Sequence, residues 1–188
     1  MSNPVMIVLI GAVVVAVVLM LIYNSLVGKK NQVENAMAGM DVQLKKRYDL
    51  IPNLVAAVRE YMKHEAGVLT EVTKLRSQLM AQNINTDART GLENQLTQAL
   101  RNVMVSVERY PELKASTNFL QLQTSLNEIE EQLSAARRFF NSAVTDFNNA
   151  VEMFPTSLLA GMMNYRKRGL FEIPENERKN VNVKELFS

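Results

Sequence analysis

The chain has 188 residues and a formal net charge of +2, a length that suits one helical or mixed domain plus an anchoring segment. It contains no cysteine, which excludes disulfides and thiolate metal sites. It has a single histidine. A charge this small gives no indication of a nucleic-acid partner. With 47% hydrophobic residues and 21% charged residues, the composition argues against a disordered chain.

The chain begins with an uncharged apolar run from Val5 to Tyr23. A helix that spans the hydrocarbon core of a bilayer needs about 20 apolar residues, so this run is just long enough. A cleaved signal peptide is the alternative, but it requires a basic start and a small-residue cleavage site, and we find neither. We therefore predict an uncleaved single-pass transmembrane helix, with the lipid bilayer as its first partner.

The charges beside this run predict its orientation. Lys29 and Lys30 follow the apolar run, and no basic residue precedes it. Cytoplasmic flanks carry the excess of Lys and Arg. The expected arrangement is therefore an N-terminus outside and a C-terminal domain in the cytoplasm.

The next segment is predicted to be one long helix from Gly28 to Ala81. Its apolar residues alternate by three and four positions, the spacing of a single stripe on a helix or coiled coil. Arg47 and Glu65 fall on this stripe and interrupt it, and Pro52 predicts a kink near Tyr48 to Leu50 because proline removes a backbone donor. The members of the stripe are Val33, Met37, Met40, Leu44, Ile51, Leu54, Val58, Tyr61, Val68, Val72, Leu75 and Leu79.

Two further long helices follow. The segment from Gln82 to Arg89 has a loop composition, with Thr86 or Asp87 as the cap of a helix that ends at Tyr110-Pro111. Ser116 or Thr117 caps the third helix, whose stripe is entirely apolar until Pro155 stops it. That stripe contains Phe119, Leu122, Leu126, Ile129, Leu133, Ala136, Phe140, Ala143, Phe147, Ala150 and Phe154.

The remaining residues predict a short apolar helix from Ser157 to Asn164 and a C-terminal tail. The predicted fold is all-α: a transmembrane helix followed by an antiparallel bundle of three long helices plus a short C-terminal helix. The predicted divisions are 1–28 for the anchor, 29–155 for the bundle and 156–188 for the short helix and tail. Because the first helix is much longer than the second, either the third helix and the C-terminal segment fold back over it or other subunits cover it. The second alternative predicts a homo-oligomer.

The sequence gives no catalytic pattern. His64-Glu65 resembles the start of a zinc-protease motif, but that motif requires a second histidine at position 68, where this chain has Val68. Helical di-metal sites add Glu-x-x-His pairs, and none is present. No phosphate-binding glycine run occurs either. We therefore expect no enzyme activity, no cofactor or metal, and no small-molecule substrate.

Two basic runs have two interpretations each. Lys45-Lys46-Arg47 is either a lipid-headgroup patch or a solvated face with Arg47 bonded inward. An upright helix holds this run about 25 Å above the bilayer, well beyond the screening length of about 8 Å, which favours the second interpretation. The same alternatives apply to Arg166-Lys167-Arg168.

Charged residues on the first stripe predict structural pairs, since a polar group in an apolar seam needs a partner and can fix helix register. We expect Arg47 to meet a carboxylate from the second or third helix, either Glu108 or Glu130. Arg137 is the expected partner of Glu65.

The sequence also resembles the LemA family of bacterial membrane proteins over nearly its whole length. The most specific run is DVQLKKRYDLIPNLV, which includes Arg47 and Pro52. The E-x-Y-P-x-L-K element matches at Glu108, Tyr110 and Pro111, and further matches are Tyr23-Asn24, Leu26-Val27, Phe119, Leu122-Gln123, Glu130, the run Ala136-Arg137-Arg138-Phe139-Phe140-Asn141, Phe154-Pro155 and Phe171-Glu172. Phe140 and Leu170 stand where the family often has tyrosine, so each lacks one hydroxyl.

This resemblance implies a single-pass protein of the bacterial cytoplasmic (inner) membrane with a cytoplasmic helical bundle, and it implies no enzymatic activity. A related protein of magnetosome-forming bacteria is tied to organising that membrane compartment. The leading hypothesis is therefore a membrane-anchored scaffold that self-associates through its helices. The alternative is an adaptor that presents the bundle to another membrane protein, such as a protease or a signalling kinase.

Overall fold

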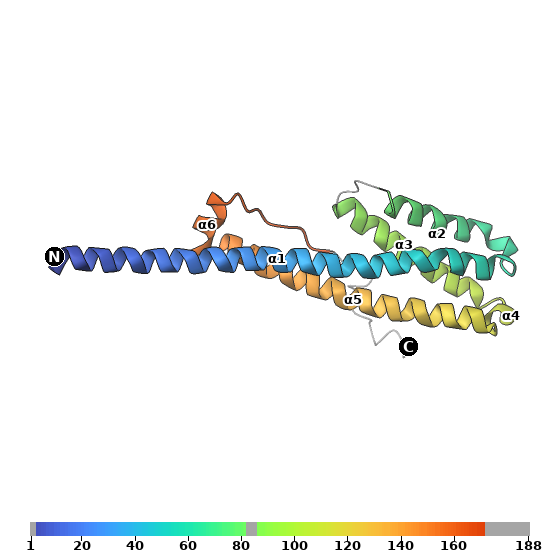
Figure 1. Cartoon of the computed structure of the whole chain (residues 1–188). Helices are drawn as coiled ribbons and strands as arrows, with labels where there is room; N and C mark the ends of the chain where they lie inside the picture. The colour runs from blue at the N-terminus through green and yellow to red at the C-terminus, as the bar shows by residue number, and fades with distance from the viewer. Residues whose placement is uncertain (1–2, 82–85, 172–188) are drawn as a thin grey trace, which may run out of the picture. The chain divides into compact units, whose positions relative to one another are not determined.

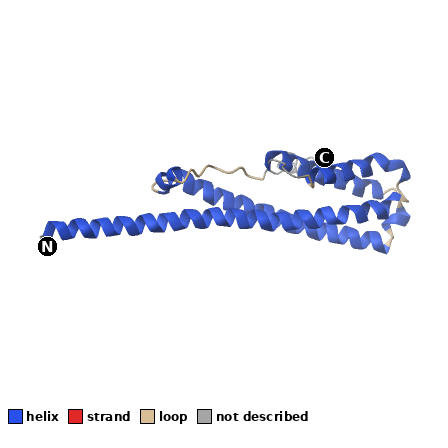
Figure 2. Ribbon diagram, turned by 45° about the horizontal axis from the view of Figure 1, so that its top comes forward, coloured by secondary structure: helices blue, strands red, loops and turns tan. Residues whose placement is uncertain are grey.

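The computed structural model describes residues 3–81 and 86–171, and over these ranges the chain is helical without any strand (Figure 2). The two longest helices are α1 (Asn3–Arg59) and α5 (Thr117–Glu152). Between them lie a 3-10 turn (Lys63–Glu65), α2 (Ala66–Leu79), α3 (Thr86–Val107) and the short α4 (Pro111–Lys114). The last helix is α6 (Thr156–Met162). The all-α prediction is confirmed.

The chain forms two compact units, and both long helices contribute to each. The first unit comprises residues 1–41 and 135–170, and the second comprises residues 42–134 and 171–188. The predicted division at residue 28 falls inside the unbroken α1, and the predicted ranges 1–28, 29–155 and 156–188 stay predictions.

The first unit contains the apolar start of α1. This part of the helix is long and apolar enough to cross a membrane, and none of its most apolar window is buried against the rest of the chain. Its side chains are therefore not those of a protein core. Farther along, Leu26 is fully buried with Ala150 of α5 and Ala160 of α6, so α6 lies beside α1 just beyond the apolar run (Figure 1).

The second unit is a set of helices around an apolar interior. Leu44, Ile51 and Leu54 of α1 are fully or almost fully buried there, together with apolar residues of the other helices. The helices α2 and α3 pack against each other. Their buried apolar residues repeat at three- and four-residue intervals, as expected for helices that bury one face: Leu69, Val72, Leu75 and Leu79 in α2, and Leu96, Leu100, Val103 and Val107 in α3.

The prediction of one helix from Gly28 to Ala81 is wrong. The helix α1 ends at Arg59, and the chain turns through Lys63–Glu65 into α2. At the turn the buried positions shift by one residue: Met62 and Leu69 are buried, whereas the predicted stripe used Tyr61 and Val68. Two helices with different phases therefore produced a nearly continuous three-and-four pattern in the sequence.

Pro52 lies inside α1, which continues through it without a break in the helix. Proline has no N–H, so the carbonyl of Tyr48, four residues earlier, loses its helical donor. Arg76 of α2 supplies a replacement, because its Nε donates to the Tyr48 carbonyl at 2.8 Å. The proline thus leaves a free carbonyl acceptor on α1. The hydrogen bond from Arg76 to this carbonyl fixes the position of α2 along α1.

Other predicted boundaries differ by a few residues. Helix α3 already begins at Thr86, so the last four residues of the loop predicted from Gln82 to Arg89 belong to a helix. Helix α5 ends at Glu152, before Pro155, and Phe154 is 79% exposed although the stripe placed it in the core. The predicted tail from residue 174 onward and Glu172 lie outside the described residues.

Candidate functional site

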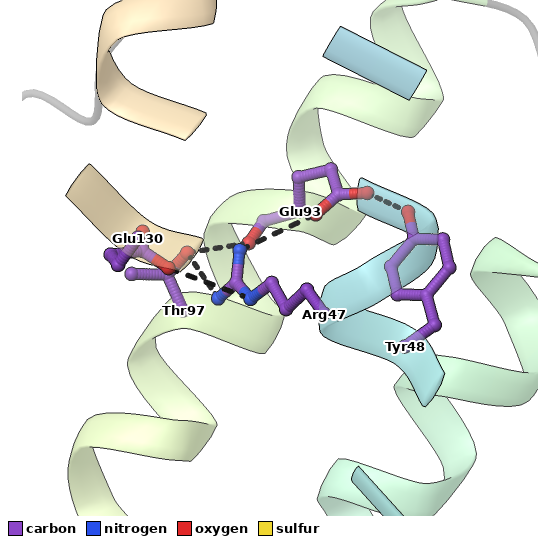
Figure 3. A network of polar contacts seen from close by, with 5 residues as sticks. All are labelled: Arg47, Tyr48, Glu93, Thr97 and Glu130. Carbon is purple, nitrogen blue, oxygen red and sulfur yellow. Dashed lines mark hydrogen bonds and ion pairs between the residues drawn. The ribbon is translucent and has the colours of Figure 1, made fainter. Parts of the chain in front are cut away.

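The buried charged residues Arg47 and Glu93 of the second unit belong to one connected polar group. We call it the Arg47 network, and its members are Arg47, Tyr48, Glu93, Thr97 and Glu130 (Figure 3). Helix α1 carries the first two, α3 carries Glu93 and Thr97, and α5 carries Glu130. The network therefore joins three helices that are distant in sequence.

The guanidinium of Arg47 is the centre of this network. Its side chain is 1% exposed, and it lies between two carboxylates, with Nη1 at 3.6 Å from Oε2 of Glu93 and Nε at 3.6 Å from Oε2 of Glu130. Nη2 donates to the Thr97 hydroxyl at 2.8 Å. That hydroxyl in turn donates to the Glu93 carbonyl at 3.0 Å. A planar guanidinium with several donors suits this kind of shared position better than a lysine would.

Glu93 is a buried carboxylate, and its side chain has no exposed surface. One oxygen pairs with Arg47, and the other accepts a hydrogen bond from the Tyr48 hydroxyl. Burial raises the pKa of Tyr48 well above its usual value, and the negative charge and hydrogen bond of Glu93 raise it further. Tyr48 therefore stays protonated as a donor, and Glu93 receives support from two neighbouring residues of α1.

The sequence prediction for Arg47 named Glu108 or Glu130 as its partner. The structure places Arg47 against Glu130, whereas the exposed Glu108 pairs with Lys114 at 2.5 Å. Lys45 and Lys46 are exposed while Arg47 is buried, which corresponds to the inward-bonded interpretation of this basic run.

Glu93 was missed in the sequence analysis. Counting back from Leu100 and Leu96 in steps of four and three leads to Glu93, so it occupies a core position of the α3 stripe. The neighbouring Leu92, by contrast, is only half-buried. A charged residue in phase with an apolar stripe was the available signal.

The remaining predicted structural residues have other surroundings. Glu65 pairs with Arg109 at 2.5 Å and not with Arg137, because α1 ends before Glu65 and the turn places it in the second unit near the end of α3. Tyr110 precedes α4, and Pro111 begins that helix, where a missing N–H costs nothing. Arg137 and Asn141 are half-buried in the first unit.

Neither of the buried charges of the Arg47 network is accessible to a substrate unless the helices separate. Among the described residues, no group of three or more His, Cys, Asp or Glu side chains lies close enough to hold a metal ion. The arrangement suits a fixed helix register, since a buried ion pair is more specific about its geometry than an apolar contact.

A groove in the same unit is a second feature. It has a volume of about 900 Å³ and lies between the end of α1 and α2. Its apolar lining includes Val55, Met62, Ala66 and Leu69, and charged residues at its edge include Arg59, Glu60, Lys63 and Lys74.

Comparison with known proteins decides the family. The model of the LemA family matches residues 36–184, most of the chain. The chain belongs to the LemA family. Together with the apolar part of α1, this membership indicates a membrane-associated protein of that family.

Curated relatives agree with this assignment. A protein named LemA from Metamycoplasma hominis is 26% identical, over 87% of this chain and 74% of the relative. Magnetosome protein MamQ 2 from Paramagnetospirillum magneticum is 21% identical over 82% of this chain, and MamQ from Magnetospirillum gryphiswaldense is 22% identical over 79%. The match spans 66% and 64% of these two magnetosome proteins.

Proposed function

We propose that this LemA-family protein is a membrane-anchored scaffold, which self-associates through its helical domain and organises membrane or membrane-protein assemblies. The apolar start of α1 anchors it in the bacterial cytoplasmic membrane. The N-terminus lies outside and the helical domain lies in the cytoplasm. The partners are the bilayer, further copies of this chain and other membrane proteins.

The observation that carries this proposal is the continuity of α1. One helix of 57 residues contains both the apolar run and Arg47, so no loop separates the anchor from the first residues of the network. A helical domain that continues directly from its membrane anchor is suited to presenting a binding surface to partners at the membrane. The magnetosome proteins among the relatives support a role in a membrane-bound structure, by analogy alone.

Self-association is supported by large apolar side chains that remain about half exposed or more outside the apolar run. Val42, Val105 and Leu120 are such residues in the second unit, and Phe139 is one in the first. Contact between copies would remove this apolar surface from water, which is favourable.

Light scattering of the full-length protein in detergent tests this proposal. We expect a mass of two or more copies that persists on dilution into the micromolar range. A strict monomer at all concentrations would overturn self-association. Protease digestion of intact spheroplasts tests the orientation separately, because a cytoplasmic domain resists digestion until the membrane is opened.

A second candidate function is an adaptor for another membrane protein, and the groove between α1 and α2 favours it. An apolar floor with mostly basic residues at its edge suits an amphipathic segment that carries acidic residues. In native membranes, cross-linking through a photoreactive residue at Thr70, which lines the groove, distinguishes the two functions. An adaptor gives adducts with other proteins, whereas a scaffold gives adducts between copies of this chain.

A further inference from the structure

Four large apolar side chains are exposed where α5 turns into α6. Met153 is 64% exposed, Phe154 79%, Leu158 64% and Met162 80%. We call this group the exposed apolar cap. The opposite side of α6 is already occupied, since Ala160 is fully buried and Leu159 and Met163 pack against the same small cluster. The four residues of the cap therefore lie on the side of α6 that does not pack against the chain, and their exposure to water is unfavourable.

The contacts of α6 place it at the end of the apolar run of α1. The cluster that includes Ala160, Leu159 and Met163 also contains Leu26 and Ile22 of α1. Ile22 belongs to the apolar run, and Leu26 lies about 4.5 Å farther along the helix axis than Tyr23. The interfacial layer of a bilayer is roughly 5–8 Å thick on each side of the hydrocarbon core. A helix at this level lies within that layer when α1 spans the membrane.

The segment after α6 is fastened to α5 within the first unit. The Asn148 side chain donates to the Arg168 carbonyl at 2.9 Å and accepts from the Arg168 N–H at 2.9 Å. The Arg168 guanidinium lies 5.4 Å from the centre of the Phe147 ring and 3.4 Å from Glu34 of α1. These contacts hold the turn beside α1, so the cap is kept at a defined level.

Basic residues flank the same level. Lys29 and Lys30 follow the apolar run on α1, and Arg166 and Lys167 follow α6. Apolar side chains with nearby Lys and Arg are the composition of a helix that lies in a membrane interface, where the apolar face enters the acyl boundary and the basic residues meet headgroup phosphates.

We propose that the exposed apolar cap inserts into the bilayer interface and gives the chain a second membrane contact beside its transmembrane helix. The ligand is a lipid surface: acyl chains for the cap and anionic headgroups for the basic residues. This inference rests on the proposed anchoring by α1. It adds that the end of α5 and α6 enter the membrane, which fixes the rotation of the first unit about α1.

Tryptophan fluorescence in vesicles with brominated lipids tests this proposal. The chain has no tryptophan, so Phe154→Trp in the full-length protein provides a single probe. We expect quenching that is strongest with bromine near the headgroup end of the acyl chain. Val14→Trp, in the middle of the apolar run, is the matched probe of anchoring. It should be quenched most by bromine near the methyl end of the lipid acyl chain.

Phe139→Trp is the control on the same unit. Phe139 is also more than half exposed, but it lies 13 residues before the end of α5 at Glu152, about 20 Å along the helix axis. It should not be quenched. Quenching of Phe139→Trp as strong as that of Phe154→Trp would overturn the proposal, because the whole unit would then lie on the lipid.

Two further results separate the possible failures. If Val14→Trp is quenched and Phe154→Trp is not, the anchor stands and the cap proposal is wrong, and a blue-shifted but unquenched Phe154→Trp would identify protein as what covers the cap. If neither is quenched, the anchoring itself fails. Adding phosphatidylglycerol to phosphatidylcholine vesicles should deepen the Phe154→Trp position at low salt, and an unchanged depth would overturn the headgroup part.

Discussion

The two units of this chain use opposite means to define their geometry. The second unit buries charge: Arg47 and Glu93 lie inside it with almost no exposed surface. The first unit has a small apolar cluster of Leu26, Ala150 and Ala160 and leaves the four residues of the exposed apolar cap uncovered. Burial of charge fixes register at a cost in stability, whereas an exposed apolar group is favourable only with a partner surface. The comparison indicates that one unit is specified internally and the other depends on its surroundings.

The largest effect is expected from Arg47→Met, which breaks the internal specification. Glu93 would keep a buried charge without its cation, and breaking such a pair costs about 3–5 kcal/mol. Urea unfolding followed by circular dichroism in detergent measures the loss. Arg47→Met combined with Glu93→Leu should recover most of it, and Lys45→Met at the exposed neighbouring position should change stability by less than about 0.5 kcal/mol. A loss below about 1 kcal/mol for Arg47→Met would show that the network is only a surface-like ion pair.

A smaller effect is expected from Arg76→Met, which leaves the Tyr48 carbonyl without a donor. Hydrogen bonds from charged groups contribute about 1.5–3 kcal/mol. In a Pro52→Ala background the backbone N–H returns to that carbonyl, so the same substitution should cost clearly less. Equal losses in the two backgrounds would mean that Arg76 stabilises the unit by packing alone.

The raised pKa of Tyr48 predicts that the free energy of unfolding falls at high pH. Its pKa is raised in the folded chain by burial and by Glu93, so the folded state keeps the proton while the unfolded tyrosine ionises above about pH 10. The contribution is complete well below pH 10 and is lost progressively as the pH rises above that value. Tyr48→Phe should lack this part of the pH dependence, whereas Tyr61→Phe should keep it. Identical profiles for the chain and Tyr48→Phe would contradict the role of this hydroxyl.

The smallest effect is expected in the first unit. Phe154→Ser should change the free energy of unfolding by less than about 0.5 kcal/mol, because Phe154 makes little contact within the chain. Phe147→Ala, by contrast, removes a buried ring and should cost about 3–5 kcal/mol. If Phe154→Ser destabilised the purified protein as much as Phe147→Ala, the exposed apolar cap would be part of a core and the comparison between the units would fail.

Much of the helical architecture was predictable, and the failures have specific causes. The apolar stripe of α5 follows one phase from Phe119 to Ala150, so that helix could be found from its period alone. The end of α1 could not, because Val58 and Leu69 lie on two helices whose stripes nearly align in sequence. Periodicity also failed at Phe154, since the helix that justified the count had already ended at Glu152.

The Arg47 network was only half predictable. A cation on an apolar stripe indicates a partner of opposite charge, which is why Glu108 and Glu130 were the two predicted candidates for Arg47, and the structure pairs it with Glu130. Glu93 and Arg76 were not found for different reasons. Predicting Glu93 required the correct phase of the apolar stripe on α3. Predicting Arg76 required two facts: that Pro52 leaves the Tyr48 carbonyl without its helical donor, and that α2 is a helix separate from α1.

Counting copies in a membrane tests the central claim, self-association of the anchored chain, most directly. Lys45→Cys in this cysteine-free chain accepts one fluorophore at an exposed position, and the full-length protein can be reconstituted in vesicles at a large excess of lipid. Single-molecule photobleaching should then give two or more steps in most particles, corrected for labelling efficiency. A single step in nearly all particles would contradict the account.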